Sequence, residues 1–203
     1  MRALYFSFLF LLSAQVFGQL PTWVPEKDWN SFMGYLQNEQ WDKSSKLAES
    51  LLKKCPKAET DDMTAAIIRY AYIISEAGLM EEKKLDQEKA LKNVQSFTGH
   101  PVIMPAHTIS TKTGYNGFNK IQPVSSLSDT LLSCESNMTK TEIFTFTYIV
   151  CKTAIPTDTL AAYAGGMCRI KGTLQSITLE GMTLPHFRIY IIDADYQLDK
   201  KQR

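Results

Sequence analysis

The sequence has few of the residues and motifs that mark most catalytic and metal sites. It has only three histidines, His100, His107 and His186, and they are scattered along the chain. It contains no HExxH, no G-x-S-x-G nucleophile elbow, no CxxC pair and no close Cys/His cluster. We therefore expect a non-catalytic protein with no metal and no cofactor. A hydrolase whose site is assembled from distant residues is the alternative.

An excess of one sign of charge is also missing. Lys and Arg number 22, and Asp and Glu number 21, which gives a formal net charge of +1. A balanced chain has no general electrostatic attraction for nucleic acid or for an anionic membrane. Beyond the first residues, no apolar run reaches the length of a membrane-spanning helix. We therefore expect no membrane span and consider nucleic acid an unfavoured partner.

The N-terminal residues have the pattern of a secretory signal peptide. In "MRALYFSFLFLLSAQVFGQ" one basic residue, Arg2, precedes a short apolar core that ends at small and polar residues. The core is short for a bilayer span, although a retained N-terminal anchor is the alternative. We expect residues 1–18 to be removed after Gly18, leaving Gln19 as the new terminus of a periplasmic or secreted protein. Loss of Arg2 leaves equal numbers of basic and acidic residues.

Cysteine is present but sparse. The four residues Cys55, Cys134, Cys151 and Cys168 could pair completely in three ways, and an exported protein meets conditions that permit disulfides. Cys151 and Cys168 bracket a short predicted helix, so a disulfide between them is our specific expectation. Free buried thiols are the alternative, because cysteine is among the most buried residue types.

Residues 19–96 have a helical pattern. Apolar residues recur at intervals of three and four, which predicts about four helices joined by short turns, that is, antiparallel helical hairpins. Thr60 with Asp61 and Asp62 is suited to begin a helix, and Gly78 is suited to end one. The periodic positions are Trp29, Phe32, Met33, Leu36, Leu47, Leu51, Leu52, Ile67, Ile68, Ala71 and Ile74.

Part of this helical region resembles a tetratricopeptide repeat. In "YLQNEQWDKSSKLAESLLKKCP", Tyr35, Trp41, Ser44 and Pro56 fall at positions where such repeats carry an aromatic, a second aromatic, a small residue and proline. Leu51 departs from the small-residue preference of its position. A second unit can be laid over Ala71, Gly78 and Ala90. The resemblance implies helices that approach closely at small residues, whereas a plain four-helix cap explains the same pattern.

Residues 97–203 have a β pattern, with alternating β-branched or aromatic and polar residues. Strands are predicted in "HPVIMPAHTIS", "SDTLLSC" and "KTEIFTFTYIVCKT", with a loop at "TKTGYNGFNKIQP" and a short helix in "TDTLAAYAGG". A hairpin follows, with strands over residues 167–179 and 186–193 and a turn near Gly181. Gly172 faces inward and suits a strongly bent strand. In "DAD", Asp193 and Asp195 are interpreted as a solvated strand end.

The order strand, strand, strand, short helix, strand, strand resembles the oligonucleotide/oligosaccharide-binding (OB) fold, and "CRIKGTLQSI" resembles the fourth strand of such barrels. We therefore expect an α+β protein in which helical hairpins precede a small antiparallel five-stranded barrel, with a small β-sandwich as the alternative. Limited proteolysis between Ser96 and Asn119 would show whether the halves are separate domains.

The OB resemblance implies a ligand face on the second and third strands, flanked by two loops. It implicates Phe144, Phe146 and Tyr148 on the long strand, Tyr115, Asn116 and Phe118 in the first loop, and Thr183 and His186 at the second. We expect an exported binding or scaffold protein that recognises a protein, peptide or glycan partner. Oligonucleotide binding and hydrolysis are the alternatives.

Overall fold

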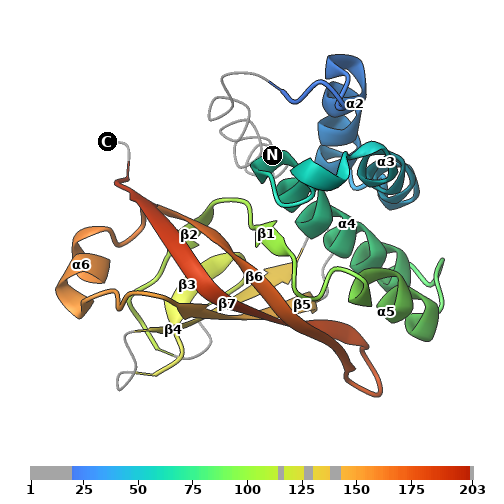
Figure 1. Ribbon diagram of the computed structural model, residues 1–203. Helices are drawn as coiled ribbons and strands as arrows, with labels where there is room; N and C mark the ends of the chain where they lie inside the picture. Colours follow the sequence, from blue (N-terminus) through green and yellow to red (C-terminus); the bar gives the residue numbers. More distant parts are fainter. Residues whose placement is uncertain (1–19, 114–116, 126–129, 138–142, 202–203) are drawn as a thin grey trace.

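The computed structural model of the chain describes residues 20–113, 117–125, 130–137 and 143–201, and the predicted signal peptide lies outside them. Helices precede the sheet, as the α+β expectation requires (Figure 1). The helical elements are α2 (Glu26–Gln37), α3 (Trp41–Lys54), η1 (Lys57–Glu59), α4 (Met63–Glu81), α5 (Gln87–Gln95) and, later in the chain, α6 (Thr157–Ala162). The strands are β1 (Pro101–Ile103), β2 (His107–Ile109), β3 (Lys120–Pro123), β4 (Leu131–Asn137), β5 (Ile143–Cys151), β6 (Met167–Glu180) and β7 (His186–Asp199).

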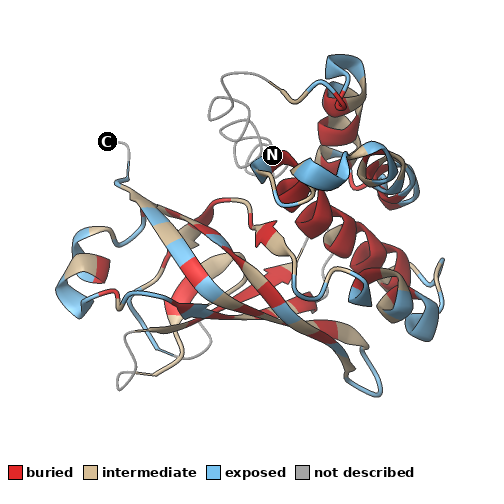
Figure 2. Cartoon of the chain, viewed as in Figure 1, coloured by how far each residue is buried: buried red, intermediate tan, exposed pale blue. Residues whose placement is uncertain are grey.

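Helix α4 is the central helix, and almost every residue along it is buried (Figure 2). Asp62 caps its N-terminus by accepting a hydrogen bond of 2.6 Å from the backbone N–H of Ala65, within the segment predicted to begin a helix. On one side α4 packs against α3, where the Ser44 and Ser75 hydroxyl oxygens lie 2.7 Å apart. Small residues at this contact allow the two helix backbones to approach closely.

Gly78 does not end a helix, contrary to the prediction, because α4 continues to Glu81. The glycine instead makes room for a side chain of α3. A Cβ built on Gly78 would lie 2.5 Å from Cδ2 of the Trp41 ring, closer than such atoms approach. The tryptophan therefore packs directly on the backbone of α4, and its ring also meets Phe144 of β5 at a centroid distance of 6.1 Å.

The seven strands form one mixed sheet in the order β1-β6-β2-β3-β4-β5-β7, and β6 also pairs with β7. The six strands β6, β2, β3, β4, β5 and β7 therefore form a closed ring of neighbours, in which the last strand, β7, pairs with the first, β6. Strand β1 pairs with a different part of β6 from the part that pairs with β2. The expectation of five purely antiparallel strands was wrong. β2–β3 and β5–β7 are parallel, and the strand β3 lies in a segment predicted to be a loop.

The β6–β7 hairpin packs closely at Gly172, where a bent strand was predicted. A Cβ on this glycine would lie 2.5 Å from Cγ2 of Ile191 and 2.8 Å from the carbonyl oxygen of Ile192. The ladder register shifts at the same place, and Asp193 on the opposite strand has a φ of 49°. This arrangement is a β-bulge, in which one strand carries an extra residue. The "DAD" segment therefore lies at a bulge inside β7, which continues to Asp199.

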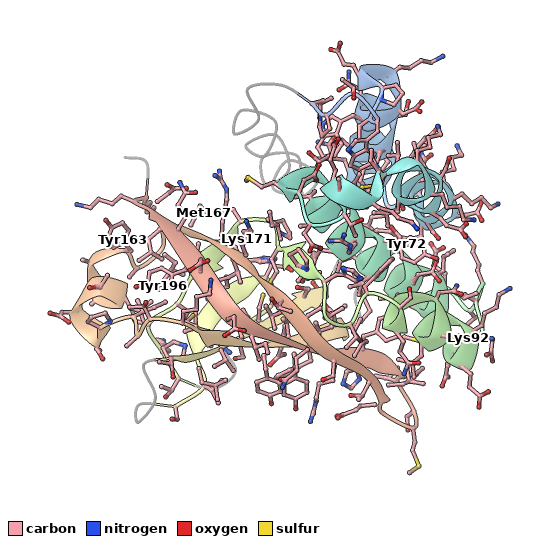
Figure 3. The ribbon with its side chains drawn as sticks, viewed as in Figure 1. Tyr72, Lys92, Tyr163, Met167, Lys171 and Tyr196 are labelled. Carbon is pink, nitrogen blue, oxygen red and sulfur yellow. The ribbon has the colours of Figure 1, made fainter. Side chains whose placement is uncertain are left out.

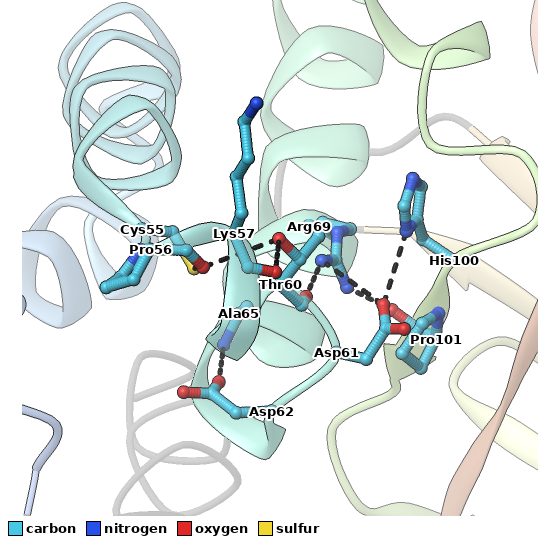
Figure 4. Close-up of polar contacts among 10 residues, drawn as sticks. All are labelled: Cys55, Pro56, Lys57, Thr60, Asp61, Asp62, Ala65, Arg69, His100 and Pro101. Atoms are coloured by element: carbon cyan, nitrogen blue, oxygen red, sulfur yellow. Dashed lines mark hydrogen bonds and ion pairs between the residues drawn. The ribbon is translucent and has the colours of Figure 1, made fainter.

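The helices are joined to the sheet through α4 and β1. Arg69 is only 3% exposed, and it donates one hydrogen bond of 2.8 Å to the Pro101 carbonyl and another to the Thr60 carbonyl (Figure 4). Asp61 lies 3.9 Å from the same guanidinium and 3.2 Å from Nδ1 of His100. One continuous cluster of buried apolar residues extends from α2 to β7.

Candidate functional site

The candidate site is the outer surface of strands β5 and β7, which pair in parallel. Their inner surfaces are fully buried, with Thr145, Thr147 and Ile149 on β5 and Phe187, Ile189 and Ile191 on β7. Outward-pointing residues alternate with these and are partly exposed. We call Phe146, Tyr148, Arg188 and Tyr190 the aromatic face. Strands in parallel pairs are usually covered on both surfaces, so the exposure of this face is unusual.

The strand register brings the aromatic face together. Tyr148 lies directly beside Tyr190, and Phe146 beside Arg188. The two tyrosine rings are stacked, with centroids 5.2 Å apart and planes 19° apart, while Phe146 lies 5.1 Å from Tyr148 at 45°. Such offset and tilted arrangements are favourable for aromatic pairs. One face of Tyr148 therefore stacks on one face of Tyr190, and the ring of Phe146 is tilted against Tyr148.

Arg188 completes this surface. Its Cζ lies 5.9 Å from the centroid of Phe146 and 5.7 Å from that of Tyr148, within range of a cation–π interaction. Its Nη2 lies 2.6 Å from a carboxylate oxygen of Glu180 on β6. On the other side, Glu135 of β4 lies beside Phe146. Burial raises the pKa of Glu135, and His186 lowers it to a smaller extent. The rings are therefore bordered by Arg188, which is paired with Glu180, and by the carboxyl group of Glu135.

The structure brings only some of the predicted site residues together. Phe146 and Tyr148 belong to the aromatic face, whereas Phe144 is 4% exposed and packs in the core against Trp41, so its ring is not accessible to a ligand. Thr183 is exposed in the β6–β7 turn, and Nδ1 of the half-buried His186 lies 3.1 Å from the Leu184 carbonyl. Phe118 is half-buried just before β3. Tyr115 and Asn116 lie outside the described residues.

Arg188 and Tyr190 were missed by the sequence analysis. The alternation in "HFRIYIID" does place both on one surface of a strand. What could not be read from that alternation was the neighbour of this strand. The parallel β5–β7 pairing joins segments about 40 positions apart, and only that pairing places Tyr190 against Tyr148.

The four cysteines are free thiols, and Cys134, Cys151 and Cys168 are buried. Burial raises the pKa of each of these three thiols. The expected disulfide between Cys151 and Cys168 is not formed. Cys151 lies beside Ala194 and Cys168 beside Leu198, on opposite sides of β7. Those neighbours are separated by roughly 13 Å along the strand, whereas bridged Cα atoms lie within about 7 Å.

Among the described residues, no three His, Cys, Asp or Glu side chains are grouped so that they could hold a metal ion. None of the helices in that part of the chain combines the length and the apolar character needed to cross a bilayer. No protein-family model, curated protein or solved structure matches the chain.

Proposed function

We propose that this chain is a non-catalytic binding protein that engages a polypeptide partner, either a protein or a peptide, through the aromatic face. The observation that carries the proposal is the stacked Tyr148–Tyr190 pair on a partly exposed parallel strand pair, with the guanidinium of Arg188 over Tyr148. Tyrosine and arginine are enriched among the residues that dominate protein–protein binding energy. They provide rigid apolar area together with hydrogen-bonding groups at the edge.

The state of the rings favours a polypeptide over the other ligand classes considered. A nucleobase or a sugar stacks on a free ring face. Here one face of Tyr148 is directed to Tyr190, and Arg188 lies over Phe146 and Tyr148. Because Arg188 is also paired with Glu180, it offers no unbalanced positive charge to phosphate groups. A polypeptide can use ring edges, the tyrosine hydroxyls and the apolar side chain of Val150.

The proposal includes three finer features. An OB-like barrel is supported by the return of the pairings to β6, the parallel β5–β7 pair, and the position of α6 between β5 and β6. Repeat-like helical hairpins are supported by the close contacts at Ser44–Ser75 and Trp41–Gly78.

Export rests on the pattern of residues 1–18 and predicts Gln19 as the N-terminus of the mature protein. N-terminal sequencing of protein secreted by its producing cells tests this, and an intact Met1 would contradict it.

The binding proposal is tested by photocrosslinking from position 148 in the producing cells, followed by affinity measurement with the purified partner. Replacing both Tyr148 and Tyr190 with alanine should weaken that affinity at least about tenfold, because each ring is at the centre of the proposed contact. Tyr163→Ala is the matched control. Tyr163 also lies beneath a cation, Lys200, at 5.7 Å, but at the α6 end of the sheet (Figure 3).

Two results would contradict the proposal. One is equal affinity of the double variant and the wild type for the crosslinked partner. The other is a crosslinking pattern that is the same from positions 148 and 163. A glycan array probed in parallel separates the ligand classes, since saturable glycan binding that is lost in the double variant would retain the site but replace its polypeptide partner.

A further inference from the structure

The turn that joins β6 and β7 carries two exposed apolar side chains, and we call residues 181–185 the hairpin tip. Met182 is fully exposed and Leu184 is 53% exposed, which makes them two of the four large apolar residues that are exposed in the described part of the chain. Apolar residues scattered singly over a surface are normal, whereas only Thr183 separates these two. Figure 1 shows the tip at the opposite end of the hairpin from α6, and Figure 2 shows it exposed.

The backbone of the hairpin tip is held in one shape. Gly181 has a φ of 84°, and a Cβ built on it would collide with the Leu184 carbonyl oxygen, so only glycine fits there. Nδ1 of His186 lies 3.1 Å from the same oxygen. At the base of the tip, Glu180 pairs with His186, and an ion pair of 2.6 Å joins Glu180 to Arg188 across the strands. A preorganised turn of this kind lowers the entropy cost of binding.

The hairpin tip continues the aromatic face along the same strand. His186 and Arg188 flank the buried Phe187 on β7. They therefore lie on the outer surface of the sheet, together with Tyr190. Leu184 is six positions from Tyr190, which is about 20 Å of extended chain. A standard protein interface buries about 800 Å² on each partner, an area roughly 30 Å across. The aromatic face alone is too small for such an area, and the tip extends it to the required length.

The charges around the hairpin tip favour a protein pocket over a lipid bilayer. Residues 181–185 carry no charged side chain, and the guanidinium of Arg188 is paired with Glu180. Segments that bind membrane surfaces present several lysine or arginine side chains to them. Even a whole myristoyl chain binds a bilayer only marginally, and Met182 and Leu184 together carry fewer apolar carbons. A desolvated pocket in a protein needs no such charges to hold two side chains that a rigid turn presents.

We propose, on the basis of the proposed binding function, that Met182 and Leu184 insert into an apolar pocket of the same partner that the aromatic face engages. The hairpin tip anchors the partner at one end of the interface, and the stacked Tyr148 and Tyr190 contact it at the other. Because a pocket needs several packed elements around it, the partner is a folded protein and not a short peptide.

The test uses the full chain and the partner crosslinked from position 148. Met182→Ser combined with Leu184→Ser should weaken the affinity for that partner at least about tenfold, because burial of each apolar side chain contributes roughly that factor or more. The Tm should not change, since both side chains are exposed in the free protein. Met63→Ser is the matched control. Met63 is also exposed, at 43%, but lies at the start of α4, so the affinity should stay unchanged.

Equal affinity of the tip double variant and the wild type would overturn the proposal, while the variant that lacks both Tyr148 and Tyr190 would still report on the aromatic face. The reverse pattern, in which only the tip double variant binds weakly, would reject the proposed role of the aromatic face and support the tip as the anchor.

Two further measurements exclude other occupants of the hairpin tip. If the wild type bound vesicles of mixed phosphatidylcholine and phosphatidylglycerol and the double variant did not, the tip would belong to a membrane and the proposal would be wrong. A dimer of the pure chain that dissociates in the double variant would overturn it as well, since the occupant would then be a second copy.

Discussion

His107 on β2 is a buried histidine in an unfavourable place for a charge. The backbone of Asn119 lies within hydrogen-bonding reach of its ring, and no side chain among the residues described here pairs with either ring nitrogen. Burial lowers the pKa of this imidazole from 6.5 to about 4, and the nearby backbone of Asn119 weakly opposes the shift. The folded protein therefore holds His107 neutral at pH values where the unfolded chain binds a proton.

The protein should consequently lose stability as the pH falls from about 6.5 towards 4, because the depressed folded pKa makes the unfolded state bind more protons over that window. A shift of this size corresponds to about 3 kcal/mol. Urea unfolding at pH 7 and pH 4.5 measures the loss. His107→Gln should reduce the pH dependence, whereas His100→Gln, at a partly exposed site, should retain it. Identical pH slopes for the wild type and His107→Gln would disprove the assignment.

At the scale of elements, two glycines that lie inside helices differ in the space beside their Cα atoms. Gly34 lies inside α2 with no atom within 4 Å of a built Cβ, whereas at Gly78 in α4 the Trp41 ring occupies that space. Glycine is unfavourable in a helix interior because it has the most backbone freedom to lose. Only Gly78 has a packing reason to be present.

Gly34→Ala should therefore stabilise the protein by about 0.5–1 kcal/mol. Gly78→Ala should destabilise it by about 1–3 kcal/mol, because the added methyl group forces the tryptophan ring off the helix. Thermal unfolding followed by far-UV circular dichroism compares the two. If both substitutions raised the Tm, the close packing of Trp41 on α4 would be incorrect.

These elements also show what could be predicted from the sequence. The three-and-four spacing of apolar residues indicated the helices, and the alternation of "EIFTFTYIV" indicated β5, because both patterns follow from local geometry. Gly78 was taken as a helix end because its real partner, Trp41, belongs to another helix. The four-residue strand β3 was too short to show a period.

The candidate site was predictable only in part for a related reason. Phe146 and Tyr148 follow from the alternation within one strand. Burial of Phe144 depends on a ring supplied by α3, and the addition of Arg188 and Tyr190 depends on the parallel β5–β7 register. Contacts between distant segments are set by packing of the whole chain and leave no local sequence signal.

At the scale of the whole molecule, the question is whether helices and sheet unfold together. The buried apolar cluster is continuous across them. Arg69 adds a polar connection, since one guanidinium serves a carbonyl in the turn before α4 and a carbonyl of β1. Residues 101–109 are paired with β6 or bonded to it through most of their length, so they do not form a free linker. We therefore expect one cooperative unit.

Arg69→Met tests this expectation, because it keeps an unbranched apolar side chain but leaves the Thr60 and Pro101 carbonyls without their donor. The variant should lose about 2–4 kcal/mol of stability, given that buried groups bonded to a charged partner are costly to leave unpaired. The unfolding transitions followed by far-UV circular dichroism and by tryptophan fluorescence should move together. Fluorescence reports the helical part, which contains Trp23, Trp29 and Trp41, while circular dichroism also reports the sheet.

Lys46→Met, at an exposed i,i+4 ion pair, is the control and should have little effect. Two separated transitions, with the fluorescence change alone moved by Arg69→Met, would show that the helices unfold independently of the sheet.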